Sequence, residues 1–176
     1  MFLKNYTSEQ PVSQTIFKIE QILIRCGVHA IQKEYRQDGS VTALTFTITL
    51  SGGSPWPIRV PADVEKALDA LWKNYVGDDK LTPDGKALEW SRKKLKRESF
   101  RDQAERTAWK IMQDWIEVQM SMIQMQQADW RQVFLPYVWD GKRSYFDRLV
   151  DTRFAGLIPE KTDDHDSTET PAKGRS

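Results

Sequence analysis

The sequence predicts an α+β fold in which a three-stranded antiparallel meander carries helices on one face. Three observations support this prediction. A helical apolar pattern precedes two turn signals, an alternating run from Val41 to Leu50 lies between those turns, and a second helical pattern follows Pro61. The predicted order over residues 12–76 is therefore helix, three strands and helix. A helical extension over residues 86–155 completes a single α+β domain of residues 1–158.

The first helix is predicted from apolar residues that recur every three or four positions between Val12 and Cys26. Ser13 or Thr15 is the expected cap, because a side-chain oxygen at the start of a helix accepts a hydrogen bond from a free backbone N–H. Gly27 stands where a glycine commonly ends a helix. This pattern indicates a helix with one buried face.

The three strands are marked by alternation and separated by turns. His29 to Arg36 alternates, and Asp38-Gly39 turns the chain into Val41 to Leu50, where large apolar residues alternate with threonines. One face of that strand is therefore buried, while the other can face water. Three prolines within residues 55–61 confine the third strand to a sheet edge, because proline has no N–H for a neighbouring strand.

A second helix is predicted to begin at Asp63. Residues 77–85 contain two glycines and a proline, which predicts a loop. Residues 86–97 follow a further helical pattern. The apolar face of that segment does not line up with the face of the helix after it. We therefore expect an interruption at residues 98–100, with Ser99 as the next cap.

The helix from Gln103 to Met125 has two neighbouring apolar stripes that together cover roughly 200° of its surface. Residues 118–128 contain no charge. Two interpretations remain open: a central helix between the sheet and residues 133–155, or a face for self-association or partner docking. The second interpretation assigns interface contacts to Trp109, Trp115, Ile116, Met120 and Ile123.

The last part of the domain is predicted to be less regular. Residues 133–139 are apolar and contain Pro136, so an extended segment packed on the core is expected. Residues 144–155 can form a short helix with an apolar face. Residues 159–176 contain no large apolar side chain, which predicts a disordered tail.

Composition restricts the classes of protein to consider. The 176 residues have a formal net charge of +1 and one cysteine, so neither a global basic excess nor a disulfide or cysteine-rich zinc framework is available. The sequence has no run of 18 apolar residues, and its start lacks the pattern of a secretory signal. We therefore expect a soluble, cytoplasmic protein that requires no cofactor and does not enter the membrane.

A cationic segment over residues 92–101 is the strongest polar feature, with six cations and one anion. Such a segment can neutralise phosphates and bind nucleic acid in a salt-dependent manner. Trp90 and Phe100 flank it and could stack on unpaired bases. The alternative is a solvated linker helix. The residues predicted to contact phosphate are Arg92, Lys93, Lys94, Lys96, Arg97 and Arg101.

Residues suited to catalysis are few. His29 and His165 do not form a pair at ligand or triad spacing, and Cys26 lies on the apolar stripe of the first helix. Two carboxylate pairs share helical faces with a nearby cation: Asp114 and Glu117 with Lys110, and Asp147 and Asp151 with Arg148. Ion pairs on the helix surface therefore explain these carboxylates better than a Mg²⁺ site, and we expect no catalytic or metal site.

The order of helix, three strands and helix also occurs in the double-stranded-RNA-binding domain, which places lysines at the start of its second helix. The corresponding residues 61–65 are acidic here, so the predicted topology matches while the binding surface does not. A different resemblance is carried by Gln103 to Lys110, Asp114 to Glu117 and Phe134 to Tyr137. With these motifs the chain resembles, over residues 4–158, a group of small uncharacterised proteins of bacteriophages and other mobile elements. The resemblance implies a phage or mobile-element origin and brings no activity with it.

The sequence thus predicts a non-enzymatic accessory protein that binds nucleic acid through the cationic segment, with the long helix supplying oligomer contacts. The alternative is a protein-interaction module, such as an inhibitor or adaptor directed at a host protein, that uses the helix rich in tryptophan, methionine and glutamine.

Overall fold

The computed structural model describes residues 3–49, 53–78 and 96–154, without the side chains of residues 76–78. Its elements, in chain order, are α1 (Val12–Arg25), β1 (Ala30–Tyr35), β2 (Val41–Thr49), β3 (Pro55–Pro61), α2 (Val64–Asp78), η1 (Arg97–Phe100), α3 (Arg101–Gln124), α4 (Trp130–Phe134), η2 (Leu135–Tyr137) and α5 (Tyr145–Asp151). The predicted α+β class is confirmed, including the order of helix, three strands and helix and the long helix after it.

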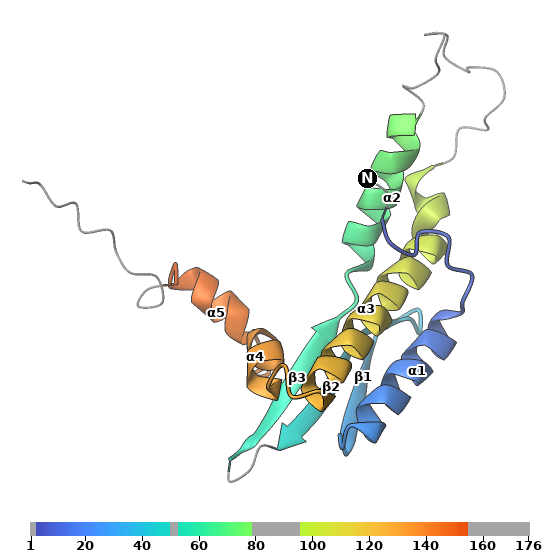
Figure 1. The fold of residues 1–176 in the computed structure, drawn as a ribbon. Coiled ribbons are helices and arrows are strands. Elements are labelled where there is room, and N and C mark those ends of the chain that lie inside the picture. The colour runs from blue at the N-terminus through green and yellow to red at the C-terminus, as the bar shows by residue number, and fades with distance from the viewer. Residues whose placement is uncertain (1–2, 50–52, 79–95, 155–176) are drawn as a thin grey trace, which may run out of the picture.

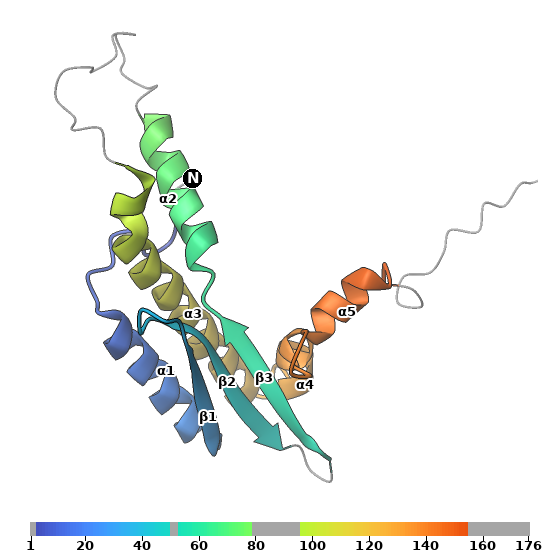
Figure 2. The ribbon, with the colours of Figure 1, turned by 180° about the vertical axis from the view of Figure 1, so that it is seen from behind.

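The sheet is an antiparallel meander in the order β1-β2-β3. α1 and α3 lie side by side on one face of this sheet, and the view from behind shows the other face without a covering helix (Figure 1, Figure 2). α2 continues past the end of β3 and packs along the first part of α3 (Figure 1). The long helix therefore covers the sheet itself, and α2 extends beyond it.

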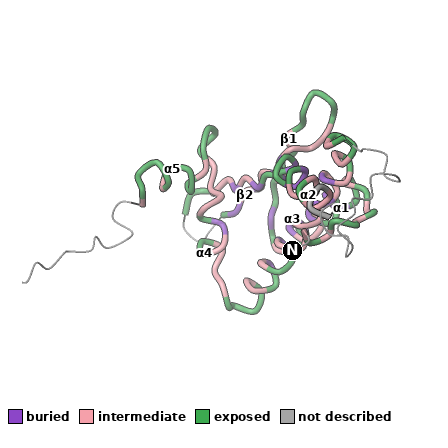
Figure 3. Tube along the Cα trace, turned by 90° about the horizontal axis from the view of Figure 1, so that it is seen from above, coloured by how far each residue is buried: buried purple, intermediate pink, exposed green. Residues whose placement is uncertain are grey.

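The core lies between the sheet and the two helices on its face. Its largest fully buried apolar side chains come from α1, β2, β3, α2 and α3: Ile19, Leu23, Leu44, Phe46, Ile58, Val60, Leu68, Trp109 and Ile116. Phe134 of α4 joins them, with its ring 5.4 Å from that of Phe46. Figure 3 shows buried positions concentrated in this centre, whereas α5 is mostly exposed.

β3 is an edge strand, as its prolines predict, and the backbone shows why three prolines fit. The Ala62 N–H donates to the Thr42 carbonyl of the β2 side at 3.0 Å. The Pro57 carbonyl instead accepts from the Trp139 N–H at 2.8 Å, on the opposite side. Because backbone groups alternate in direction along a strand, positions 55, 57 and 61 all face away from β2. The prolines therefore remove no hydrogen bond from the sheet.

The predicted helix caps are wrong at two places. The N-cap of α1 is Pro11, and Thr15 is buried inside the helix, where its hydroxyl accepts from Gln10 at 2.7 Å. α3 begins after Phe100 without a side-chain cap, so Ser99 does not cap it. The interruption expected at residues 98–100 is present as the 3-10 turn η1. The Thr15 hydroxyl lies one turn inside the helix, where it also donates to the Pro11 carbonyl at 3.3 Å, so it does not accept from the free N–H groups at the helix start.

Residues 133–139 are predicted to be extended, but the structure has α4 and η2 as far as Tyr137. The reason is Asp129, whose side chain accepts from the Arg131 N–H at 2.8 Å, while the side chain of Gln132 accepts from the Asp129 N–H. This capping box starts a helix just before the proline. Only the short stretch after Tyr137 is extended, and it runs along β3.

α5 is shorter than the predicted helix over residues 144–155, although Ser144 caps it in a second capping box. Its apolar side chains do not enter the core, since Phe146 is 49% and Val150 47% exposed. The predicted helix over residues 86–97 lies outside the described residues except for its last two positions, and so do Leu50 and the predicted tail over 159–176. None of the described helices combines the length and apolar character that a membrane span needs.

Candidate functional site

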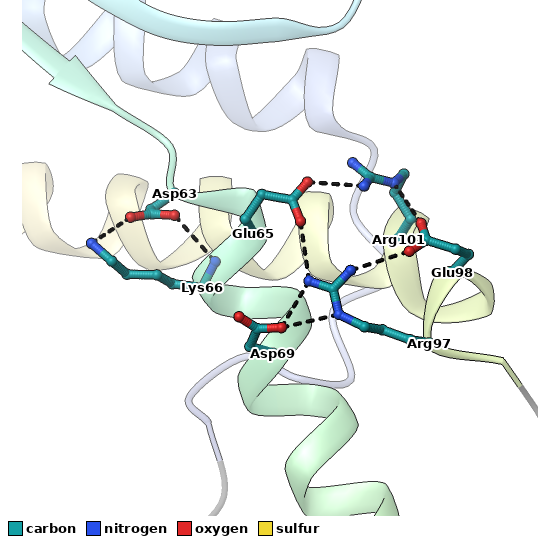
Figure 4. A network of polar contacts seen from close by, with 7 residues as sticks. All are labelled: Asp63, Glu65, Lys66, Asp69, Arg97, Glu98 and Arg101. Carbon is teal, nitrogen blue, oxygen red and sulfur yellow. Dashed lines mark hydrogen bonds and ion pairs between the residues drawn. The ribbon is translucent and has the colours of Figure 1, made fainter.

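Two of the six predicted phosphate-binding residues form ion pairs within the protein. Arg97 contacts Asp69 at 2.7 Å, Glu65 at 3.1 Å and Glu98 at 3.1 Å, and Arg101 contacts Glu65 at 2.9 Å and Glu98 at 3.2 Å (Figure 4). The two arginines pair with three carboxylates in total, so this cluster has no excess of positive charge. Hydrogen bonds from both arginines lower the pKa of Glu65.

The ion-pair cluster joins α2 to the start of α3, which is a structural role. A phosphate would have to displace carboxylates to reach Arg97 or Arg101, so the sequence-based assignment of these two residues to phosphate contact is corrected. Lys96 is exposed just before η1. Arg92, Lys93 and Lys94 lie outside the described residues.

Phe100 does not offer its ring to a base. It packs 5.1 Å from the ring of Tyr75 and 6.1 Å from that of Trp72, both on α2. Together with the ion-pair cluster, this aromatic contact holds η1 against α2. The other predicted stacking residue, Trp90, lies outside the described residues.

Three of the five predicted interface residues belong to the core. Trp109 and Ile116 are 0% exposed and Met120 is 2% exposed, so none is available for a partner, which corrects the interface assignment. The indole N–H of Trp109 donates to the Val41 carbonyl at 3.3 Å. Trp115 and Ile123 are half-buried against the same core. The long helix is thus a central helix that packs against the sheet, α1 and α2, and Trp115 adds ring contacts to Phe134 of α4 and Tyr137 of η2.

The expected pairing of Asp114 with Lys110 is present at 3.0 Å. Asp114 also accepts from Lys4 at 2.8 Å and from Asn5 at 3.0 Å, which ties the N-terminal segment to α3. Burial of the carboxyl opposes its ionisation, but the three donors outweigh burial and lower the pKa of Asp114 to about 2. These contacts give the carboxylate a structural role.

The second carboxylate pair is engaged differently from the prediction. Asp147 accepts from the hydroxyl of Ser144, and Asp151 pairs with Arg143. Arg148 pairs with Asp140 and not with the carboxylates beside it on α5. Among the described residues, no three side chains of His, Cys, Asp or Glu gather closely enough to hold a metal ion.

The two isolated candidates for catalysis also have ordinary surroundings. His29 is exposed between α1 and β1. Cys26 is half-buried and its sulfur accepts from the Gln124 amide at 3.6 Å. Burial raises the pKa of the Cys26 thiol, which disfavours the reactive thiolate.

A groove of about 430 Å³ lies where the open edge of β3 meets η2 and α5. We call it the edge groove, and its lining consists of Arg59, Pro61, Pro136, Tyr137, Trp139, Ser144, Phe146 and Asp147. Three aromatic rings and two prolines dominate this lining. None of these residues is assigned to a site from the sequence alone.

A short hairpin that pairs with β3 positions the rings of the edge groove. Val138 pairs with Ile58, and the Trp139 N–H donates to the Pro57 carbonyl at 2.8 Å. The chain then reverses at Gly141, whose φ of +97° suits glycine. On the return, the Tyr145 N–H donates to the Val138 carbonyl at 2.8 Å. Phe146 therefore comes beside Trp139 at the mouth of the groove.

Of the two charged groups that line the edge groove, Arg59 is paired with a carboxylate and Asp147 has only hydrogen bonds from Ser144. The guanidinium of Arg59 binds both carboxylate oxygens of Glu34 at 2.7 Å and lies 4.7 Å from the centroid of the Trp139 ring. The hydrogen bond from Arg59 lowers the pKa of Glu34. Asp147 accepts from the Ser144 hydroxyl at 2.7 Å. The open part of the groove is therefore mostly apolar, and the exposed Asp147 is its one charged group without an ion pair among the described residues.

Comparisons with protein families, characterised proteins and solved structures find no match to this chain. The case for a function therefore depends on the geometry of the described residues.

Proposed function

We propose that this chain is a non-enzymatic protein-interaction module that holds a partner protein in the edge groove. The accessible apolar lining of the groove supports this proposal, because concave sites with aromatic walls and few polar groups favour binding. Large aromatic side chains contribute most of the energy at many protein interfaces. The phage resemblance supports the further proposal that the protein acts in the cytoplasm of a host cell, on a host or phage partner.

The exposed rings explain why the groove suits a partner. Phe146 is 49% exposed, and Tyr137 and Trp139 are only half-buried, so a partner would remove apolar surface from water at all three. Arg59, which Glu34 holds in place, lies against the Trp139 ring, and the Tyr137 ring packs 5.2 Å from that of Trp115. These two rings are thus held in place before binding, which lowers the entropy cost of association.

Photo-crosslinking in the native cell tests this proposal. A photoreactive amino acid at position 146 should crosslink one protein, whereas the same group at Tyr35, which is 62% exposed on β1, should not. The purified partner should lose about tenfold or more in affinity with Phe146→Glu, because a charge replaces an apolar anchor. Tyr35→Ala is the matched control and should bind normally. Equal crosslinking from both positions, or full affinity of Phe146→Glu, would exclude the edge groove as the interaction site.

The cationic segment supports a second candidate function, nucleic-acid binding, in which Lys96 joins Arg92, Lys93 and Lys94 on phosphates. Fluorescence anisotropy with labelled single- and double-stranded DNA and RNA should then show affinity that falls with salt, with a log-log slope of at most about 4. Changing these four cations to Gln should abolish binding, while Arg97→Gln should leave the slope unchanged, because Arg97 already pairs with carboxylates. No affinity at low salt, or a lower slope for Arg97→Gln, would contradict this assignment.

A further inference from the structure

We infer that the occupant of the edge groove is an extended peptide strand without acidic side chains that donates backbone N–H groups to the free edge of β3 and packs an apolar side chain against the rings of Trp139 and Phe146. This inference rests on the proposed function and names the chemistry of the partner.

The backbone of β3 presents acceptors toward the groove. The Pro57 carbonyl points away from β2 and accepts from Trp139, while the Ala62 N–H points toward β2. By the alternation of a strand, the carbonyls of Arg59 and Pro61 face the same side as that of Pro57. Both residues line the groove, and no donor among the described residues reaches either carbonyl. The hairpin at residues 138–139 therefore covers only the first part of this edge.

Proline leaves the outward edge of β3 with carbonyl acceptors and few N–H donors. Pro57 and Pro61 have no N–H, so the outward positions of β3 offer mainly carbonyls. Two carbonyls that are two residues apart in a strand lie roughly 6.8 Å apart, which matches the spacing of alternate N–H groups in an extended peptide. A peptide main chain is thus the complementary donor, as in binding by strand addition.

The charges of the groove select against an acidic side chain. Arg59 is already paired with Glu34 and lies against the Trp139 ring, while the exposed Asp147 is itself an anion that accepts a hydrogen bond from Ser144. An acidic side chain entering the groove would lose water without gaining a partner of opposite charge. An aliphatic or aromatic side chain instead fills the space between the rings of Tyr137, Trp139 and Phe146.

The test uses the full chain and an array of capped heptapeptides composed only of Gly, Ser, Thr, Val, Leu, Ile and Phe. Peptides that bind are remeasured by fluorescence anisotropy in solution. N-methylation of one amide at a time should lower affinity about fivefold or more at two alternate amides and leave the amide between them without effect. Replacing the apolar anchor of the peptide by Glu should lower affinity about tenfold.

Variants of the protein test whether the peptide binds in the edge groove. Phe146→Glu should lower peptide affinity about tenfold, and this variant should fold because the ring is 49% exposed. Trp139→Ala should have a similar effect, and Tyr35→Ala should have none. Peptide binding that is indifferent to N-methylation or to Phe146→Glu would overturn the inference.

Three further outcomes would also overturn it. If no peptide binds while the crosslinked partner still requires Phe146, the proposed function stands and the partner uses a folded surface. If Phe146→Glu lowers the mass measured by light scattering, a second copy occupies the groove. If Leu157→Ser with Ile158→Ser in the full chain raises peptide affinity about tenfold, the occupant is this chain's own segment over residues 155–159.

Discussion

Met120→Lys is expected to unfold the protein. Met120 is 2% exposed on α3 and packs within the core cluster, so its replacement would bury an ammonium group without a partner. Such a change costs about 4 kcal/mol or more, which is a large part of the stability of a typical domain. Urea titration followed by circular dichroism should show loss of the native transition, or a large fall in the free energy of unfolding.

Val118→Lys is the matched control for this prediction. Val118 lies two residues earlier on the same helix and is 54% exposed, so lysine there should change the free energy of unfolding by about 0.5 kcal/mol or less. Light scattering on both variants separates core from interface. A folded Met120→Lys protein with a lower mass than the parent would restore the interface assignment of Met120.

Asp114→Asn should give the second large effect, and the effect should depend on pH. The carboxylate accepts from Lys4, Asn5 and Lys110, and the pKa of Asp114 is lowered to about 2. Its unfolded pKa is about 3.9. Because the folded value is the lower one, the stabilisation is fully present above about pH 4 and is lost as pH falls toward 2. At neutral pH it is roughly 2 kcal/mol.

Free energies of unfolding between pH 2 and pH 7 would measure this contribution. The parent should exceed Asp114→Asn by roughly 2 kcal/mol at neutral pH, and the difference should shrink toward zero near pH 2. Glu117→Gln changes an exposed carboxylate on the same helix and should have little effect at any pH. A difference between parent and Asp114→Asn that stays constant across this range would show that packing, and not ionisation, explains it.

The fold was predictable where local patterns and burial agree. Leu44, Phe46 and Ile48 alternate with threonines along β2 and are buried, as the period of a strand requires. The prolines of β3 marked an edge strand for the same local reason. The starts of α1 and α3 were not predictable from residue type, because both helices begin without a side-chain cap, at Pro11 and Phe100, although Thr15 and Ser99 have the chemistry of caps.

The candidate site was harder to predict, since its decisive contacts join distant parts of the chain. Arg97 pairs with Asp69, which lies 28 residues earlier, and Arg101 pairs with Glu65, 36 residues earlier. The cationic run is visible in the sequence, whereas two of the three carboxylates that pair with its arginines lie on α2. The edge groove has the same property, because Arg59 meets Trp139 only after the hairpin docks on β3.

The sequence by itself determined the class of the fold, the order of its elements and the sidedness of the sheet, because hydrophobic periodicity and turn residues act over a few neighbouring positions. Only the tertiary structure decided that the tryptophan-rich helix is core, that two of the arginines are paired internally, and that an aromatic groove opens beside β3. Exposure and charge pairing depend on which elements come together in space, and a linear pattern does not contain that information.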